Sequence, residues 1–409
     1  CNGVIVDGIT VRGIAGLGVL TWRASHIVLR NLTVEWTSQS ALMLSHGRHD
    51  DPMVKDLTVE NCRVNQSNLG LWRDEGHSDP RKRGYEMRSE TVSLVRWDGF
   101  RVHHNHISNS LMEGIDFKEG SRNGEIHHNL VEQCRSAGIY ANEGRDTKIH
   151  HNIVRRIGYY DPQNGDGLLR GGEYLARKLP GSNVGEPGAT GILISNGDLN
   201  GPGRPPLEVG RVSGIQVYEN EISWTRKAAI SLWNEWRKEK KDGWVIDSIR
   251  IDNNTCYQTC LGPNPVSAAI LFDAAATNIC IRNNILVGSD KFGMHMWDRP
   301  DWPQPLSPPT REVTHNLFYA NAKQHTLGDQ PIQAAPLFRA PPKQITGNAD
   351  FRLRAGSPAR DAGVDTDLPC AGDSAKDLGA YEYNLPRWQA GIVDEHTAKT
   401  PRAESDRDN

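Results

Sequence analysis

Several features that the 409-residue sequence lacks narrow its class before any motif is considered. It has no apolar run near the ~18–20 residues that a membrane-spanning helix requires, and no apolar segment typical of a secretory leader. Its 47 Lys and Arg against 50 Asp and Glu give a net charge of −3, with no long basic block. We therefore expect neither a membrane partner nor a nucleic-acid partner.

The sequence also lacks the short motifs of several common enzyme and metal-site classes. Its seven cysteines include no C-x-x-C pair, which is too sparse for a disulfide scaffold. No H-E-x-x-H zinc motif, no Gly-rich phosphate loop opening a helix and no G-x-S-x-G nucleophile elbow occurs. No repeat unit contains a convincing amphipathic helix, so we expect an all-β fold.

What the sequence does contain is an internal repeat with the frame apolar-x-x-Asn-x-apolar. The fourth position of this frame is occupied in turn by Ile9, Leu32, Cys62, Asn105, Asn129, Asn152, Asn220, Asn254, Asn284 and Asn316. The shortest spacings, 23 and 24 residues, define the bare repeat unit, and longer spacings contain loops. Asn at one fixed position predicts a ladder of stacked side chains in a turn.

A second strand follows each frame, usually opened by Gly or Ala. Examples are GVLTW (18–22), GLWRD (70–74), GIDFK (114–118) and GIYAN (138–142). Strict alternation of apolar and variable residues indicates strands with one buried face. Short strands repeating without crossover helices can coil, each turn stacking on the last at ~4.8 Å. The sequence therefore predicts a parallel β-helix of about ten coils.

Two segments, GIDFKEGSRNGEIHHN (114–129) and AGIYANEG (137–144), resemble the pectate-lyase-like right-handed β-helix proteins. Two others, ADFRLRAGSPARDAG (349–363) and KDLGAYEY (376–383), resemble the closing segment of bacterial β-helix carbohydrate-active enzymes. The resemblance implies a right-handed parallel β-helix over residues 1–383 and a carbohydrate-active enzyme with a polysaccharide or oligosaccharide substrate. It also implies an extracellular or periplasmic location. The family includes lyases, hydrolases, epimerases and binding proteins, so the fold does not select the reaction.

Two insertions interrupt the repeat, near residues 75–94 and 159–190. We expect both to project beside the strands GIDFK and GIYAN, where loops on a rigid scaffold often form a site. The polar segment 384–409 is expected to be a loosely attached tail.

Alternation places a set of aromatic and polar side chains on the outer face of the second strands. Aromatic rings interleaved with carboxylates and amides suit sugar rings, so we expect a glycan groove there. The candidate substrate-binding residues are Trp22, Trp72, Tyr140, Asn142, Trp233, Asp273, His295 and Trp297. The alternative is that the aromatic residues are ordinary packing under inserted loops.

The candidate catalytic residues gather around GIDFK and are Asp74, Asp116, Lys118, Glu119 and Glu143. Asp74 and Lys118 are expected in one column, one coil or ~4.8 Å apart. We favour a polysaccharide lyase that acts on a uronate-containing glycan, with Lys118 as the base. MEGID (112–116) resembles the acidic calcium cluster of one pectate-lyase family, which implies a possible Ca²⁺ site formed by Asp74, Glu113 and Asp116.

Other interpretations remain open. A glycoside hydrolase would use Asp74 with Asp116, or Asp116 with Glu143, as its pair of carboxylates. Epimerisation and non-catalytic glycan binding are further alternatives, and Asp74 with Lys118 could be a plain structural ion pair. The paired histidines of three consecutive frames, His103/His104 to His150/His151, are expected to form a structural turn ladder rather than a transition-metal site.

Overall fold

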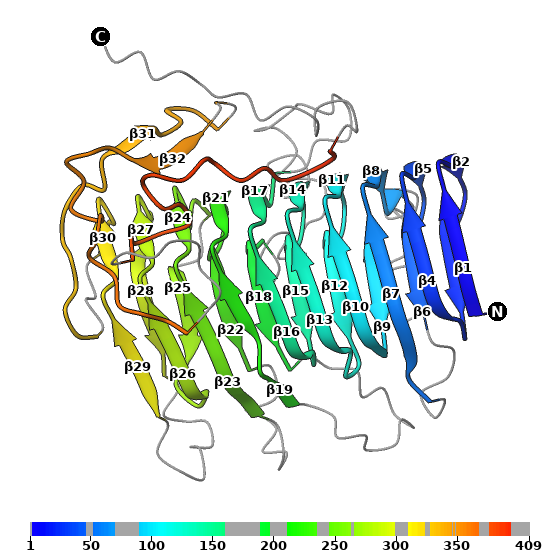
Figure 1. The fold of residues 1–409 in the computed structure, drawn as a ribbon, viewed down its shortest axis with the longest axis horizontal. Helices are drawn as coiled ribbons and strands as arrows, with labels where there is room; N and C mark the ends of the chain where they lie inside the picture. Colours follow the sequence, from blue (N-terminus) through cyan, green and yellow to red (C-terminus); the bar gives the residue numbers. More distant parts are fainter. Residues whose placement is uncertain are drawn as a thin grey trace, which may run out of the picture.

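The computed structural model describes residues 2–45, 52–69, 90–159, 189–196, 211–234, 245–262, 266–298, 310–323, 328–345, 347, 349–367 and 376–393. These residues form three long parallel sheets that share one hydrophobic core, and each coil contributes one strand to each sheet (Figure 1). The described residues contain no helix long and apolar enough to cross a membrane.

The three sheets are named A, B and C in the order in which the chain visits them. Sheet A contains β1 (Asn2–Asp7), β4 (Ser25–Arg30), β7 (Val54–Glu60), β10 (Trp97–His103), β13 (Arg122–His127), β16 (Arg145–His150), β19 (Arg211–Ser213) with β20 (Gln216–Tyr218), β23 (Val245–Asp252), β26 (Thr277–Arg282) and β29 (Arg311–Thr314). Sheet B contains β2 (Thr10–Ile14), β5 (Thr33–Thr37), β8 (Arg63–Ser67), β11 (His106–Ser110), β14 (Leu130–Cys134), β17 (Ile153–Ile157), β21 (Glu221–Thr225), β24 (Thr255–Tyr257), β27 (Ile285–Val287) and β30 (Leu317–Tyr319). Sheet C contains β3 (Val19–Trp22), β6 (Leu42–Ser45), β9 (Val92–Val95), β12 (Ile115–Lys118), β15 (Ile139–Asn142), β18 (Ile192–Ser195), β22 (Ile230–Trp233), β25 (Ala268–Asp273) and β28 (Phe292–Trp297).

The asparagine ladder lies in the turn between sheets A and B, as predicted. Asn105 Nδ2 donates to Asn129 Oδ1 at 3.0 Å, and the same bond links Asn129 to Asn152. The series continues through Asn220, Asn254, Asn284 and Asn316 at 2.9–3.0 Å. Each side chain also donates to backbone carbonyls, so these buried amides are satisfied within the turn.

The small residues that open the strands of sheet C are required by close backbone contact. A Cβ atom on Gly114 would lie 2.6 Å from the carbonyl oxygen of Gly138 in the next coil. A Cβ on Gly191 would meet the carbonyl of Ala229 at the same distance. Any side chain larger than hydrogen would push the coils apart there, which explains the repeated Gly before these strands.

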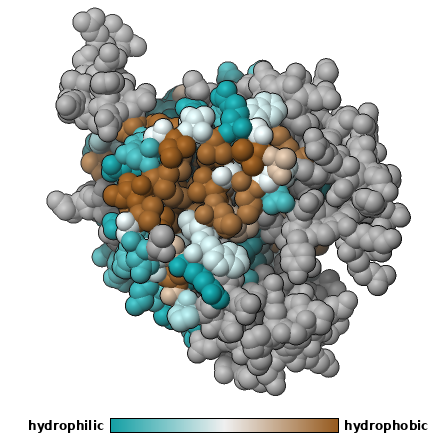
Figure 2. Space-filling view, turned by 90° about the vertical axis from the view of Figure 1, so that its right-hand side faces the viewer, coloured by the Kyte–Doolittle hydropathy of each residue, from teal (hydrophilic) through white to brown (hydrophobic). Residues whose placement is uncertain are grey.

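The two ends of the helix differ. Antiparallel β31 (Phe338–Ala340) and β32 (Asp350–Leu353) contribute Phe338 and Phe351 to a second apolar cluster, packed against Ile285 and Leu317. At the other end, Figure 2 shows an apolar patch on the face that carries β1 to β3. Its side chains include the exposed residues Ile5, Ile9, Ile14, Leu20 and Trp22.

The chain after residue 376 packs against the helix instead of hanging loose. Residues 376–393, named here the C-terminal strap, run back across the turns between sheets A and B (Figure 1). Trp388 lies against His151, and the backbone N–H of Gly391 donates to the His128 carbonyl at 2.9 Å. The expectation of a loose tail therefore does not hold for residues 384–393, and the remaining residues lie outside the described part of the chain.

Candidate functional site

A cluster of charged side chains lies at β12, on the face of sheet C that points away from the core. Ile115 and Phe117 of this strand pack in the core, so alternation turns Asp116 and Lys118 outward. Both outward side chains are nevertheless buried, Asp116 completely. Lys118 Nζ forms ion pairs with a carboxylate oxygen of Glu90 and with Asp116 Oδ2, the latter at 3.2 Å.

Glu113 completes this group, named here the acidic cluster (Glu90, Glu113, Asp116 and Lys118). The hydroxyl of Ser136 donates to Glu113 Oε1 at 2.6 Å, whereas Glu113 Oε2 is buried without a hydrogen-bond partner among the described residues. Within the same part of the chain, Asp116 Oδ1 has no partner and Asp116 Oδ2 has the Lys118 ion pair. Buried polar atoms without partners are uncommon, and a ligand or an ordered water can satisfy them.

Electrostatics in the cluster favour protonated carboxyls beside a charged lysine. Burial raises the pKa of Asp116 well above its usual value, and the Lys118 charge offsets only part of this effect. Burial, reinforced by the Glu90 charge, also raises the pKa of Glu113. Burial disfavours the ammonium form of Lys118, but the charges of Glu90 and Asp116 outweigh it and raise the lysine pKa. Burial thus favours the protonated forms of Asp116 and Glu113, whereas the neighbouring carboxyls favour the charged form of Lys118.

The expected column of Asp74 and Lys118 is wrong. Lys118 pairs in register with Val95 of β9 on one side and with Asn142 of β15 on the other. The strand of the preceding coil is therefore 92–95, inside the expected insertion, and not GLWRD at 70–74. Trp72 and Asp74 lie outside the described residues.

Glu90 is the functional candidate that the sequence analysis missed. The backbone N–H of Thr91 donates to the Glu113 carbonyl, so Glu90 and Glu113 occupy equivalent positions in consecutive coils. The sequence signal is the segment TVSLV (91–95), which contains the sheet C strand of the coil before β12. Aligning this segment with GIDFK (114–118) aligns Glu90 with Glu113. Arg135, beside Ser136, was also missed. Burial lowers its pKa, and the charge of Glu113 opposes that effect.

Four of the predicted residues adjoin the acidic cluster along the chain or across the sheet. Tyr140 pairs in register with Asp116, and Asn142 pairs with Lys118. Asn142 is buried, and its Oδ1 has no hydrogen-bond partner. Glu119 and Glu143 follow β12 and β15 at equivalent turn positions with left-handed φ angles of 56° and 60°.

The aromatic residues of sheet C form a packed pair instead of an open row. Trp233 and Trp297 stack with ring centroids 4.3 Å apart, and Lys227 Nζ lies 4.8 Å from the Trp233 ring centre. Both contacts involve the partly exposed Trp233 ring that was expected to stack on a sugar, and its role in substrate binding stays a prediction.

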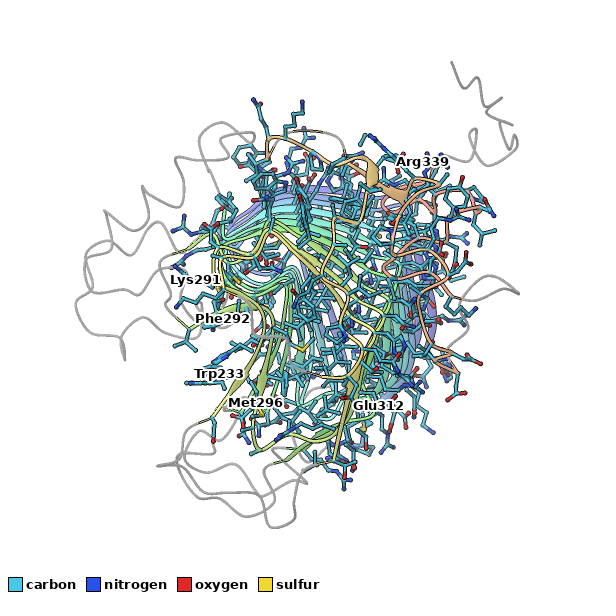
Figure 3. The ribbon with its side chains drawn as sticks, turned by 90° about the vertical axis from the view of Figure 1, so that its left-hand side faces the viewer. Trp233, Lys291, Phe292, Met296, Glu312 and Arg339 are labelled. Carbon is cyan, nitrogen blue, oxygen red and sulfur yellow. The ribbon has the colours of Figure 1, made fainter. Side chains whose placement is uncertain are left out.

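Two other residues predicted to bind substrate, Asp273 and His295, contact other residues of the protein. Asp273 lies in register with Trp297, is buried, and accepts a 2.7 Å hydrogen bond from the Ala275 backbone. His295 stacks on Phe292 at 4.6 Å. Figure 3 shows Trp233, Phe292 and Met296 on the sheet C side of the helix, away from Glu312 of β29. Trp22 is exposed but lies on β3, three coils or about 14 Å from β12.

The calcium expectation has no counterpart in the described part of the chain. There, no group of three or more His, Cys, Asp or Glu side chains is arranged to hold a metal ion. Glu113 and Asp116 lie in one cluster, but the third expected ligand, Asp74, is outside the described residues.

A polar groove of about 610 Å³ lies elsewhere, on the outer face of sheet A. It is lined by His26, Asp56, Arg101, Glu125 and Lys148 among others. It contains none of the predicted site residues, so the acidic cluster and the groove are separate features.

Comparison with known proteins agrees with the fold. Residues 17–174 match the family model described as a right handed beta helix region. The solved structure of pectate lyase Pel9A shares 13% identity over 88% of each chain, with a TM-score of 0.46. A glycoside hydrolase shares 12% identity over 72% of this chain and 50% of its own, with a TM-score of 0.44. The A-module of the Azotobacter vinelandii mannuronan C-5 epimerase AlgE4 shares 12% identity over 81% and 79%, with a TM-score of 0.40.

Because these identities and TM-scores are low, neither the fold nor a reaction is inferred from these three structures. No curated protein is significantly similar in sequence. The family match, the three parallel sheets and the stacked asparagines agree with one another. The chain therefore folds as a right-handed parallel β-helix, the fold that its resemblance to pectate-lyase-like proteins implied.

Proposed function

We propose that the protein is a carbohydrate-active enzyme and that the acidic cluster is its catalytic centre. The observation that supports this most strongly is Asp116, a fully buried carboxyl that pairs with Lys118 through Oδ2 and has no partner for Oδ1 among the described residues. Burying a carboxyl with one oxygen unpaired is unfavourable for stability. Perturbed carboxyls of this kind concentrate at catalytic sites.

The geometry favours glycoside hydrolysis. A carboxyl with a raised pKa, here Asp116, can protonate the leaving glycosidic oxygen. A second carboxylate then attacks the anomeric carbon or activates a water molecule. Glu90, the ion-pair partner of Lys118, is suited to this second role. The Lys118 ammonium lies between the two carboxyl groups, because its Nζ pairs with both Glu90 and Asp116.

β-Elimination on a uronate-containing glycan, favoured by the sequence analysis, is the second candidate. One observation supports it: Arg135 is a partly buried cation next to the cluster and could neutralise a uronate carboxylate. The expected base does not fit this mechanism. Lys118 is held protonated by Glu90 and Asp116, and a base must be unprotonated to abstract a proton.

Sugar contacts in this proposal come from strands on the C-terminal side of β12. Asn142 and Ser195 follow Lys118 in register, one coil apart, and Tyr140 follows Asp116. Among the described residues, the amide oxygen of Asn142 and the hydroxyl of Ser195 are buried without hydrogen-bond partners, and both suit sugar hydroxyls. An extracellular or periplasmic location is part of the same proposal, since polymeric glycans occur there.

A panel of polysaccharides read by two assays tests the proposal. Polygalacturonate, alginate, xylan and galactan are incubated with the protein, and reducing ends and ultraviolet absorbance are both followed. New reducing ends without absorbance support hydrolysis, and reducing ends with absorbance support elimination. Glu113→Gln and Glu90→Gln should lower either activity, whereas Lys148→Ala, an exposed change on sheet A, should not. Tight glycan binding without any product would identify a binding protein and contradict the enzyme proposal.

A further inference from the structure

The C-terminal strap is attached along the helix by contacts of two kinds. At its start, Asn253 Nδ2 donates to the Asp377 carbonyl at 2.9 Å. In its middle, the buried Glu221 carboxylate accepts hydrogen bonds from Tyr381 at 2.7 Å and from Arg387 at 2.9 Å. These contacts join the strap to the coils of β21 and β24, which contain no paired histidines.

The outer end of the strap, residues 388–393, lies instead on the histidines. The Trp388 ring centroid is 5.3 Å from that of His151 and 6.1 Å from that of His128. The N–H of Gly391 donates to the His128 carbonyl at 2.9 Å, and the N–H of Val393 donates to Asn61 Oδ1 at 3.0 Å. A change in the charge of the His128 or His151 ring therefore alters the contact that holds Trp388 on the helix.

The six paired histidines form two stacked columns, named here the histidine ladder. His103, His127 and His150 stack at 4.8–5.2 Å, and His104, His128 and His151 stack at 4.9–5.0 Å. Within each coil the two rings meet edge to face, with Nδ1 atoms 2.8–2.9 Å apart. This confirms the prediction of a turn ladder.

In each contact between two Nδ1 atoms, one ring must donate its Nδ1–H and the other must accept with an unprotonated Nδ1. A first further proton enters at Nε2 of the donor ring and makes the pair cationic. A second proton would place two N–H donors face to face and break the contact. The stacking would then bring like charges within about 5 Å of each other along the column, where they repel strongly.

We propose that the outer end of the strap is an acid-sensitive latch, which leaves the helix when the histidine ladder takes up protons. This inference is independent of the proposed enzymatic function. Release hydrates the rings and removes Trp388 from them, so protonation and opening favour each other. Asn253 and Glu221 hold the rest of the strap in place, and the opening is therefore confined to residues 388–393.

The pKa values of the ladder histidines show whether acid opens or closes the latch. Burial and neighbouring rings lower the pKa of His128 to about 4, that of His151 to about 3 and that of His127 to about 2. An opened, hydrated ladder would titrate near the usual value of 6.5. The opened state thus binds more protons below that pH, and acidification favours it.

The other charged groups around the ladder and strap do not produce the same response. Those facing the ladder are Glu60, Arg101, Glu125, Lys148 and Glu219, and those near the strap are Glu132, Arg155, Glu221, Asp377, Glu382 and Arg387. Burial raises the pKa of Glu221, of Asp377 and, to about 7, of Glu382, so acid favours the closed strap through these groups. The hydrogen bond from His106 and the arginine charges overcome burial and lower the pKa of Glu132 to about 2, so its contribution changes only in stronger acid.

Hydrogen–deuterium exchange of the Gly391 and Val393 amides tests the latch. Protection, corrected for the intrinsic pH dependence of exchange, is measured from pH 8 to pH 5 in the intact chain. If one proton is bound on opening, protection falls about tenfold per pH unit below pH 6.5. Amides of β12 (Ile115–Lys118), in the centre of the helix, should stay protected throughout.

A matched variant is provided by the chain itself. Asn253 and Asn283 occupy the equivalent turn positions of later coils, with left-handed φ angles of 54° and 58°. The double variant His128→Asn/His151→Asn should therefore fold, keep the strap closed and lose most of its pH dependence. Unchanged protection of the wild type between pH 8 and pH 5 would overturn the latch. So would an equal pH dependence in the double variant, because other groups would then control the opening.

Discussion

Lys118 Nζ lies 3.2 Å from Asp116 Oδ2, whereas Asp116 Oδ1 has no hydrogen-bond partner among the described residues. The lysine also pairs with Glu90, whose Oε2 receives a 2.9 Å hydrogen bond from Ser93. Glu90 therefore has more polar partners than Asp116. Burial raises the pKa of Asp116 well above its usual value, which suits this carboxyl to donate a proton in acid–base catalysis.

The protonation state of Asp116 can be observed directly. With the side-chain carboxyl carbons of aspartate labelled, the Asp116 carbon-13 resonance should titrate well above the ordinary value of 3.8, because burial raises its pKa. In Lys118→Met the midpoint should move higher still, since the opposing positive charge is gone. A titration near 3.8 in the wild type would show that Asp116 is ionised at neutral pH and is not an acid catalyst.

Replacing the lysine alone should destabilise the fold. Lys118→Met leaves Glu90 and Asp116 buried without a cation, and removing one partner of a buried pair costs ~3–5 kcal/mol. Urea unfolding measures the loss. Adding Glu90→Gln to the same chain should restore much of the stability. If the single variant were as stable as Lys148→Met, an exposed lysine on sheet A, the ion pairs would have no energetic role.

The histidine ladder predicts a pH-dependent global stability. Folded His127, His128 and His151 have pKa values of about 2, 4 and 3, below the ordinary 6.5 of the unfolded chain. Their contribution is fully present above pH 6.5 and is lost as the pH falls below it, because the unfolded chain then binds more protons. Urea midpoints at pH 7.5 and pH 5 measure this. The midpoint should decrease in the wild type and change less in the variant His128→Asn/His151→Asn.

The asparagine ladder should be intolerant of interruption. Asn152 Oδ1 accepts from both the backbone and the side chain of Asn129, and its own amide donates to the Asn220 side chain. Asn152→Ala leaves several buried partners unsatisfied, each costing ~1–3 kcal/mol. Thermal unfolding should therefore show a large loss. Arg12→Ala, which removes an exposed ion pair with Glu35, is the control and should change little.

The fold was predictable because its signal is local and repeated. The same sequence frame recurs in successive coils. The Asn at its turn hydrogen-bonds to the Asn of the neighbouring coil, and this explanation applies to Asn105 and to Asn316 alike. Alternation also placed Ile115 and Phe117 in the core correctly. These features depend on contacts with the next coil, which is another copy of the same pattern.

The site was less predictable because it depends on contacts outside that pattern. Glu90 was missed since the long gap after GLWRD hid which strand belongs to the coil. The burial of Asp116 could not be inferred, because period-2 alternation assigns a strand face but not what covers it. The stacking of Trp233 on Trp297 was not evident from position alone, because Trp297 comes from two coils further on.

The most direct test of the central claim is the turnover of Asp116→Asn on the polysaccharide that the wild type degrades. The amide keeps the size of the side chain but supplies no acidic proton, so the rate should fall ~10²–10⁴-fold while the fold is retained. Asp146→Asn, the same change at an exposed position of sheet A, should act at the wild-type rate. Equal turnover by Asp116→Asn and the wild type would contradict the assignment of the acidic cluster as the catalytic centre.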